Sequence, residues 1–303
     1  MRAIVATADG PSRTEIRDVP PPAPAPNEAL IAVRAFAVNR GELTLVRRRD
    51  GWQPGQDVAG EVVQPAADGS GPQAGERVAG LAEWHGWAEQ AAVPAHRLAV
   101  LPEGVDFVHA AALPMAGTTA ANLVRQGGAL LGARVLVTGA SGGVGHIAVQ
   151  LAALGGADVT AVARPERADA MRGYGARAVV SDAGEAEGPF DLVLESVGGA
   201  SLDAAIARVA PGGALILFGN SSREPSTLDF TAFFGHEEAT IRSYFSARHE
   251  ADAGRLLAML LDLVAADRLH VEIGFEGSWD RLDEAMDGLS ERRFAGKAVL
   301  TIS

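Results

Sequence analysis

The feature that most constrains this chain is a glycine-rich turn between an apolar strand and a helix. The segment from Arg134 to Leu151 reads RVLVTGASGGVGHIAVQL in one-letter code. Its second half places apolar residues at helical spacing, which predicts a helix with one apolar face. Glycines permit a tight turn and a close approach to a pyrophosphate, and a helix N-terminus offers free N–H groups to that anion. In this context the turn predicts dinucleotide binding; the alternative is a structural turn that binds nothing.

The strand after this helix indicates which dinucleotide fits. A site for NAD carries an acidic residue about 20 residues further on, to bind the ribose 2′-hydroxyl. Here the strand ends in Arg164-Pro-Glu-Arg167, where cations suit a 2′-phosphate, so the sequence favours NADP(H). The alternative is that Arg164 and Arg167 are solvated charges at a helix start, and Glu166 in the same turn keeps it open. His146, opposite the apolar face of the preceding helix, is expected to be exposed to solvent.

The pattern around the turn predicts a doubly wound parallel sheet of the Rossmann type. A helix is expected over Phe107–Arg125 and another over Ala251–Leu269. The predicted strands of this half are Arg134–Thr138, Asp158–Ala163, Ala178–Ser181, Asp191–Glu195, Ala214–Phe218 and Ala239–Ser243.

The first hundred residues instead read as short strands separated by Pro and Gly, which predicts a β-rich domain. The predicted strands are Ala29–Ala37, Asp57–Val63, Arg77–Ala79 and Gln90–Val93, with Val271–Phe275, helix Trp279–Leu289 and strand Lys297–Ile302 in the tail. From about Asp106 the texture of the sequence changes from this β-rich half to the alternation of strands and helices.

Composition excludes several classes of function. With 26 Lys+Arg against 38 Asp+Glu the formal net charge is −12, so nucleic acids and anionic membranes are not expected partners. The absence of cysteine excludes thiolate chemistry. Lys297 is the single lysine, and no glycine-rich turn precedes it as a P-loop requires. The N-terminal residues lack a signal-peptide pattern and no apolar run could span a bilayer, so we expect a cytoplasmic protein.

Several further motifs follow one another in a characteristic order. They are AVN at 37–39, PGQDVAGEV at 54–62, GERV at 75–78, AALPMAGTTA at 111–120, DLVLESVG at 191–198, PGG at 211–213, FGN at 218–220 and FAGKAVL at 294–300. With the glycine turn, this series resembles the medium-chain dehydrogenase/reductase superfamily, in its zinc-free quinone oxidoreductase-like branch. Zinc-dependent members carry Cys where this chain has Asn39, and His-Glu where it has Gln56-Asp57, so the resemblance implies no metal.

The glycine turn also fits the short-chain dehydrogenases, which use a Tyr-x-x-x-Lys pair. The two tyrosines, Tyr174 and Tyr244, are followed four residues later by Ala178 and Arg248, so that alternative fails.

The resemblance implies a GroES-like catalytic domain made of residues 1–107 plus 270–303, and a Rossmann dinucleotide-binding domain over residues 108–269. It also implies hydride transfer from NADPH to a small molecule: a quinone, an enone or an enoyl thioester. The candidate catalytic residues are Asn39, Thr119 and Tyr244. Asn39 would lie near the nicotinamide ribose or substrate oxygen, Thr119 would begin the interdomain helix and contact the nicotinamide, and Tyr244 would line the pocket. The implied cofactor-binding set is Asn39, Thr119, Gly139, Ala140, Ser141, Gly142, Gly143, Val144, Gly145, Arg164, Arg167, Val197, Gly198, Phe218, Gly219, Asn220, Phe294, Gly296 and Lys297.

Some roles keep an alternative. Thr119 could cap its helix, and Phe294 could be a core aromatic. Glu42 and Asp57 are expected to hold loops by hydrogen bonds, and His85 to lie in a surface loop. The run Arg47, Arg48 and Arg49 could attract an acidic or coenzyme-A-like substrate, or be a solvated patch.

The proton donor is not assigned, because relatives often carry a Tyr about a dozen residues after the Asn39 position and this chain does not. The resemblance implies a homodimer through residues 238–245. Two other functions stay open. One is an enzyme that reuses the fold, either a pathway-specific enoyl or ketone reductase or a cyclase. The other is a sensor that binds NADPH without catalysis.

Overall fold

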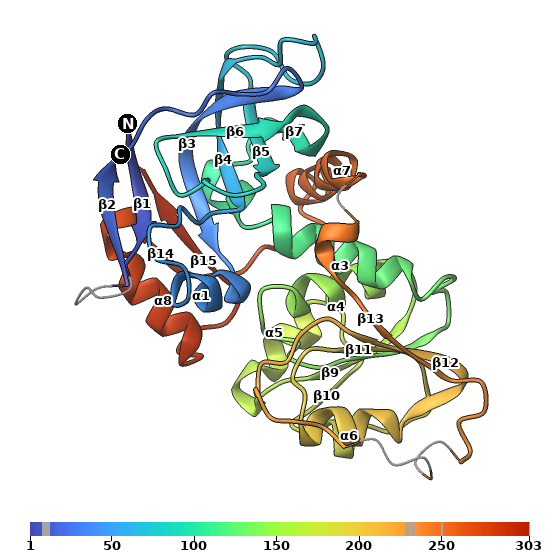
Figure 1. The fold of residues 1–303 in the computed structure, drawn as a ribbon. Helices are drawn as coiled ribbons and strands as arrows, with labels where there is room; N and C mark the ends of the chain where they lie inside the picture. The colour runs from blue at the N-terminus through green and yellow to red at the C-terminus, as the bar shows by residue number, and fades with distance from the viewer. Residues whose placement is uncertain (8–12, 228–230, 232–233, 250, 303) are drawn as a thin grey trace. The chain divides into compact units, whose positions relative to one another are not determined.

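The computed structural model describes residues 1–7, 13–227, 231, 234–249 and 251–302 (Figure 1). The chain forms two compact units, Met1–Thr118 with Arg248–Ser303, and Thr119–Ala247. The boundary falls inside helix α3 (Pro114–Arg125). Residues 108–118 and 248–269, which were expected in the dinucleotide-binding domain, belong by their contacts to the first unit.

The second unit is built on a six-stranded parallel sheet. Its strands are β8 (Arg134–Val137), β9 (Asp158–Val162), β10 (Ala178–Val180), β11 (Phe190–Glu195), β12 (Val209–Leu217) and β13 (Thr240–Ser243). They are ordered β10-β9-β8-β11-β12-β13, and every neighbouring pair is parallel. The order reverses at β8, where β9 lies on one side and β11 on the other. In such sheets ligands bind outside the carboxyl ends of the strands at this point.

Short helices connect these strands. They are α4 (Gly145–Leu154), α5 (Ala168–Gly173) and α6 (Ala200–Ile206), with 3₁₀ turns η2 (Pro165–Arg167) and η3 (Ala183–Glu185). The central strands β8, β9 and β11 are largely buried, as expected for a parallel sheet covered on both faces, whereas the edge strand β10 is half-buried and β13 mostly exposed. Leu136, Phe190 and Leu215 are inaccessible to solvent. All six predicted strands are therefore confirmed, although β12 begins at Val209 rather than at Ala214. The predicted dimer through residues 238–245 stays a prediction.

The first unit contains a seven-stranded sheet and a separate β-hairpin. The hairpin pairs β1 (Arg2–Ala6) with β2 (Thr14–Asp18). The sheet contains β3 (Glu28–Val38), β4 (Asp57–Gln64), β5 (Arg77–Leu81), β6 (Gln90–Pro94), β7 (Leu98–Val100), β14 (Ile273–Ser278) and β15 (Lys297–Thr301). Its order is β14-β15-β3-β4-β5-β7, with β6 also paired to β3. Strand β15, from the end of the chain, lies between β14 and β3 and pairs antiparallel with β3. Residues distant in sequence thus share one sheet.

The helices of this unit are α1 (Arg40–Val46), α2 (Phe107–Ala111), α7 (Ala253–Ala265) and α8 (Leu282–Ser290), with 3₁₀ turns η1 (Ala95–Arg97) and η6 (Trp279–Arg281). The 3₁₀ turn η5 (Ser246–Arg248) spans the boundary between the two units. The single helix predicted over Phe107–Arg125 is wrong: α2 ends at Ala111 and α3 begins at Pro114. The residue before a proline disfavours the α conformation, whereas proline suits the first helical position.

Helix α7 packs directly on η1 and β7, which explains why it belongs to the first unit. A Cβ atom at Gly254 would lie 2.6 Å from the carbonyl oxygens of both His96 and Leu98, so glycine permits this close approach. The unit's core includes Phe36 stacked on Trp87, with ring centroids 5.6 Å apart.

Candidate functional site

The glycine turn after β8 closes on its own backbone. Gly139 has a φ of +58°, and the N–H of Gly142 donates to its carbonyl oxygen at 3.0 Å. A Cβ atom at Gly145 would lie only 2.3 Å from that same oxygen. Gly142 is exposed, whereas Gly145, the first residue of α4, is buried. The sequence therefore folds into a turn that presents the start of α4 at the carboxyl edge of the sheet.

His146 supports this turn from inside the unit, so the prediction that it is exposed to solvent is wrong. Its side chain is buried, and Nδ1 lies 2.9 Å from the carbonyl oxygen of Gly142, to which the Nδ1-protonated tautomer donates. The ring also faces Tyr174, with centroids 6.1 Å apart. The face of α4 opposite the sheet is covered by neighbouring chain, which the 3.6-residue pattern could not indicate.

Glu195, at the end of β11, organises the next loop, although the predicted site does not include it. Its carboxylate is buried and accepts hydrogen bonds from the Thr138 hydroxyl (3.2 Å), the Ser201 hydroxyl (3.1 Å) and the N–H of Val197 (3.0 Å). The N–H of Gly198 lies 3.1 and 3.2 Å from its two oxygens. A charged residue directly after the apolar run Leu192–Leu194 was the available sign.

The loops after β11 and β12 are joined along their backbones. The N–H of Ser222 donates to the carbonyl of Val197 at 2.8 Å, and a Cβ atom at Gly198 (φ +78°) would lie 2.3 Å from Oδ1 of Asn220. That Oδ1 accepts from the Ser222 hydroxyl and the Arg223 N–H, both at 3.1 Å. Because β11 lies between β8 and β12, the structure brings three predicted segments to one edge: the glycine turn, 197–198 and 218–220.

Arg164 and Arg167 follow β9, which is the neighbour of β8. Arg164 is exposed, and its Nε lies 3.5 Å from Oε1 of Glu166, with both side chains 62% exposed. Exposed pairs of this kind contribute only about 0–1 kcal/mol, so Glu166 does not prevent the guanidinium from binding a phosphate. Arg167 is half-buried at the end of η2.

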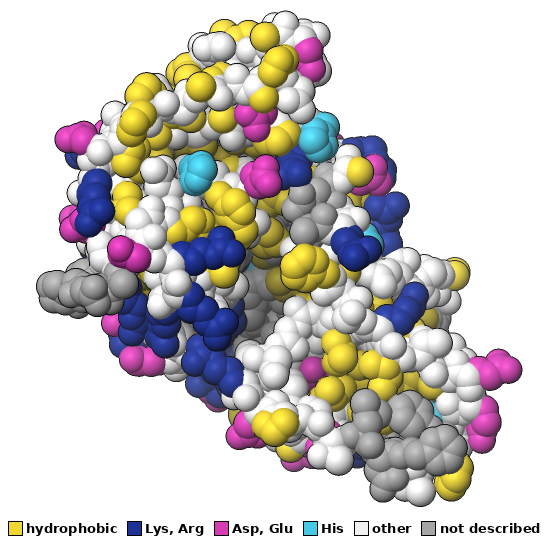
Figure 2. Space-filling model, in the orientation of Figure 1, with side chains coloured by type: hydrophobic (Ala, Val, Ile, Leu, Met, Phe, Trp, Pro, Cys, Tyr) yellow, Lys and Arg dark blue, Asp and Glu magenta, His cyan; other side chains and the backbone are white. Residues whose placement is uncertain are grey.

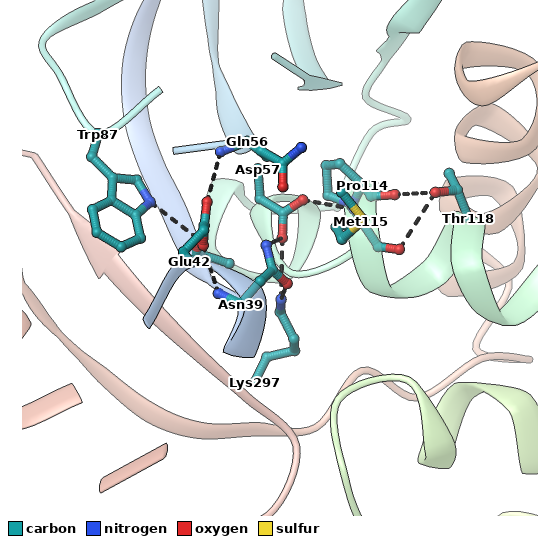
Figure 3. Close-up of polar contacts among 10 residues, drawn as sticks. Asn39, Glu42, Gln56, Asp57, Trp87, Pro114, Met115, Thr118 and Lys297 are labelled. Atoms are coloured by element: carbon teal, nitrogen blue, oxygen red, sulfur yellow. Dashed lines mark hydrogen bonds and ion pairs between the residues drawn. The ribbon is translucent and has the colours of Figure 1, made fainter. Parts of the chain in front are cut away.

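A second polar group lies in the first unit, around Asn39 (Figure 3). Nζ of Lys297 donates to Oδ1 of Asn39 at 2.6 Å and to Oδ2 of Asp57 at 3.1 Å, and Nδ2 of Asn39 donates to that same Oδ2 at 3.0 Å. The other oxygen of Asp57 accepts the N–H of Met115, at the start of α3, at 2.6 Å. Lys297 is 3% exposed, so its ammonium is used inside the unit. The orientation of the Asn39 amide is thereby fixed.

Glu42 completes this cluster. One carboxyl oxygen accepts the N–H of Asn39 at 2.7 Å and the other that of Gln56 at 3.0 Å. Burial and the neighbouring Asp57 carboxylate raise the pKa of Glu42 to about 8, against the opposing effects of the Asn39 N–H, Lys297 and the Gln56 N–H. At neutral pH the cluster therefore holds a neutral Glu42 beside an ion pair of Asp57 and Lys297. The expectation that Glu42 and Asp57 hold loops by hydrogen bonds is confirmed.

This donor set does not fit zinc. The Asn39 oxygen accepts from an ammonium, and both oxygens of Asp57 accept from N–H donors. Within the described ranges, no three His, Cys, Asp or Glu side chains gather as metal ligands.

The remaining predicted residues lie as follows. Thr119 is the sixth residue of α3 and 7% exposed, so it neither begins nor caps that helix. Tyr244 directly follows β13, is 9% exposed, and donates its N–H to Leu217 at 2.7 Å. Phe294 packs on Phe275 with centroids 6.0 Å apart, as its core alternative requires. Gly296 has a φ of +70°. His85 is exposed, as expected.

Two family profiles match the chain. One is described as an alcohol dehydrogenase GroES-like domain and covers residues 25–103. The other is described as a zinc-binding dehydrogenase and covers residues 143–262. They cover strands β3 to β7 of the β-rich sheet and strands β9 to β13 of the parallel sheet.

Individual proteins match over much of the chain. The spectinabilin polyketide synthase system protein NorB of Streptomyces orinoci is 33% identical over 92% of this chain, which spans only 13% of that protein's length. The chloroplastic quinone-oxidoreductase QR1 of Triphysaria versicolor is 31% identical, over 71% of this chain and 69% of its own. A mycobacterial protein solved in complex with NADPH superposes with a TM-score of 0.87 and 26% identity, covering 100% of both chains.

None of the helices in the described part of the chain has the length and apolar character needed to cross a membrane.

Proposed function

This chain belongs to the medium-chain dehydrogenase/reductase superfamily, in its quinone oxidoreductase-like branch, and from that premise we propose that it is an NADPH-dependent, zinc-independent reductase of quinones or α,β-unsaturated carbonyl compounds. The observation that carries the proposal is the closed glycine turn at β8, where the sheet order reverses, with Arg164 at the end of the adjacent strand. The similar mycobacterial protein that was solved with NADPH supports the choice of cofactor.

The residues of the second unit fit such a cofactor. The backbone of residues 142–145 and the N-terminus of α4 would bind its pyrophosphate, and Arg164 with Arg167 its 2′-phosphate. The backbone at Val197, Gly198 and Gly219 would border the site, since the two loops are joined there. When bound, NADPH supplies a hydride to an electrophilic carbon conjugated to a carbonyl group.

In the first unit, Asn39 is the group we assign to the substrate oxygen or the nicotinamide ribose. Its Oδ1 accepts from Lys297, and one N–H donates to Asp57, so the remaining N–H has a fixed direction. A donor held in this way stabilises developing negative charge without reorganising. Lys297 and Asp57 are then positioning residues. Water is the proton source that we propose for the enolate.

The test is a fluorescence titration with NADPH and NADH, followed by NADPH consumption with a panel of quinones and enones. We expect NADPH to bind more tightly than NADH, Arg164→Ala to weaken NADPH binding roughly 10-fold, and turnover to persist in EDTA. Equal binding of NADPH and NADH would contradict the proposal that Arg164 and Arg167 bind the 2′-phosphate. Loss of turnover in EDTA would contradict zinc independence. Binding without turnover of any acceptor would instead indicate a sensor.

A second candidate is a pathway-specific enoyl or ketone reductase. It is favoured by the match of 33% identity over 92% of the chain to a polyketide synthase system protein. The two candidates differ in the acceptor and share the cofactor site.

A further inference from the structure

Resting on the proposed function, we propose that Arg47, Arg48 and Arg49 form a binding site for phosphate, and that the substrate is an enoyl thioester carried on a phosphopantetheine arm. The three arginines follow α1 directly, with Arg47 as its C-cap residue, and all three are exposed. Figure 2 shows Lys and Arg side chains gathered on the face of the first unit where Figure 1 draws α1.

Among the residues that the structure describes, no ion pair neutralises the charges of this run. Many exposed arginines of this acidic chain have a carboxylate partner, as Arg17, Arg34 and Arg255 do with Glu15, Glu61 and Asp252. Over the described residues, by contrast, no salt bridge joins the side chains of Arg47, Arg48 or Arg49 to an acidic group. Asp50 is the exposed acid next in sequence, and Glu42 within α1 is buried and neutral at pH 7. The run is a local excess of positive charge in a chain of net charge −12.

The loop that carries these residues is anchored. The N–H of Gly51 donates to the carbonyl of Ala6 at 2.9 Å, and the N–H of Ala6 donates to the carbonyl of Trp52 at 2.7 Å, which ties the loop to β1. The Arg49 guanidinium lies 5.5 Å from the centre of the Trp52 ring, and Trp52 meets Trp84 edge-on at 5.0 Å. A cation–π contact with a braced indole holds Arg49 in place before any ligand arrives.

The chemistry of the run separates the candidate substrates. The negative end of the α1 dipole favours cations near its last turn, but that accounts for one of the charges and not for three. A quinone or a simple enone is uncharged and gains nothing from arginines at this place. A phosphate group gains two parallel N–H···O bonds from each guanidinium that it meets. Coenzyme A and the prosthetic arm of a carrier protein both present such phosphates.

The experiment compares one reacting group on two carriers. We would measure kcat/KM for crotonyl-coenzyme A and for crotonyl-N-acetylcysteamine, which carries no phosphate, in the wild type and in Arg47→Gln/Arg48→Gln/Arg49→Gln. We expect the wild type to prefer the coenzyme A ester roughly 10- to 100-fold, less so at high salt, and the triple variant to bring this ratio close to one. The variant with three lysines should restore part of the preference. Arg17→Gln/Arg34→Gln/Arg255→Gln changes the net charge equally and should keep it.

A binding measurement separates failure of this inference from failure of the proposed function. Coenzyme A is titrated against the tryptophan fluorescence, since Trp52 and Trp84 adjoin the run. If no acceptor is reduced, the proposed function fails, but quenching that the Gln triple variant abolishes still supports the phosphate site. Equal kcat/KM for the two thioesters, or no binding of coenzyme A and no turnover of a crotonyl-loaded carrier protein, overturns the inference. A higher kcat/KM for the loaded carrier than for the coenzyme A ester identifies the carrier as the source.

Discussion

Lys297 and Asp57 form an ion pair whose side chains are only 4% and 0% exposed. Lys297→Met leaves the Asp57 carboxylate buried without its cation, and we expect this to lower the free energy of unfolding by about 3–5 kcal/mol. Urea denaturation measures the change. The double variant Asp57→Asn/Lys297→Met removes both charges and should be less destabilised than the sum of the single variants. Additive effects of the two changes would contradict a direct interaction.

Glu42 makes the free energy of unfolding fall as the pH rises. Its pKa is about 8 in the folded protein against an ordinary value of 4.5, so between these values the native state binds more protons than the unfolded state. The contribution of Glu42 to stability therefore falls as pH rises from about 4.5 to 8, and it is constant above that range. In Glu42→Gln this dependence should be absent, although the variant is less stable at pH 5, because an amide NH₂ then faces a backbone N–H. Thermal unfolding of both proteins from pH 5 to 9 tests this; parallel curves would count against it.

At the level of single residues, the sequence indicated which polar residues matter better than it indicated which residues they contact. Asn39, Asp57 and Lys297 stand out in the motifs, but their mutual hydrogen bonds join positions 258 and 240 residues apart, which no local pattern encodes. His146 was misjudged for the same reason, since chain distant in sequence covers it. Glu195 was missed although its place at the end of an apolar run was visible, because its hydrogen bond to Thr138 joins two different strands. Periodicity indicates which face of a helix is apolar, not what covers the other face.

The turn between β8 and α4 depends on glycine for space, and substitution can measure that. Replacing a helical glycine with alanine normally stabilises by up to about 1 kcal/mol. At Gly173, in the last turn of α5, nothing lies within 4 Å of a new Cβ atom, so Gly173→Ala should show this gain. At Gly145 the new atom would lie 2.3 Å from a backbone oxygen. We expect Gly145→Ala to lower the melting temperature and to weaken NADPH binding at least 10-fold. A more stable Gly145→Ala protein would show that the turn has room.

The strands of the second unit were well predicted, because buried parallel strands are continuous apolar runs bounded by Gly and polar residues. The predicted ends of these strands were less accurate. Val209 and Ala210 belong to β12 although Pro-Gly-Gly follows them, and Phe190 rather than Asp191 begins β11. The predicted helix over residues 107–125 ignored Pro114. In each case the strand partner or a single proline determined the boundary, and the apolar pattern did not.

For the whole molecule, the order of strands makes the first unit depend on the end of the chain. Strand β15 joins β14 to β3, so a protein ending at Arg293 would lose the strand between them. All four tryptophans lie in this unit, at positions 52, 84, 87 and 279. We expect the truncated protein to show red-shifted tryptophan emission, whereas a protein ending at Thr301 should not. Blue-shifted, native-like emission from the shorter protein would mean that the sheet forms without β15.

The burial of Lys297 has a practical consequence for labelling. Because the chain contains no other lysine, the folded protein offers no exposed side-chain amine to acylating reagents, aldehyde cross-linkers or acetyl transfer. Cross-linking through side chains of this protein therefore needs reagents that react with groups other than lysine, such as carboxylates. The rate at which Lys297 is acylated, followed over hours by mass spectrometry, instead measures how often the β-rich unit opens locally and exposes this amine.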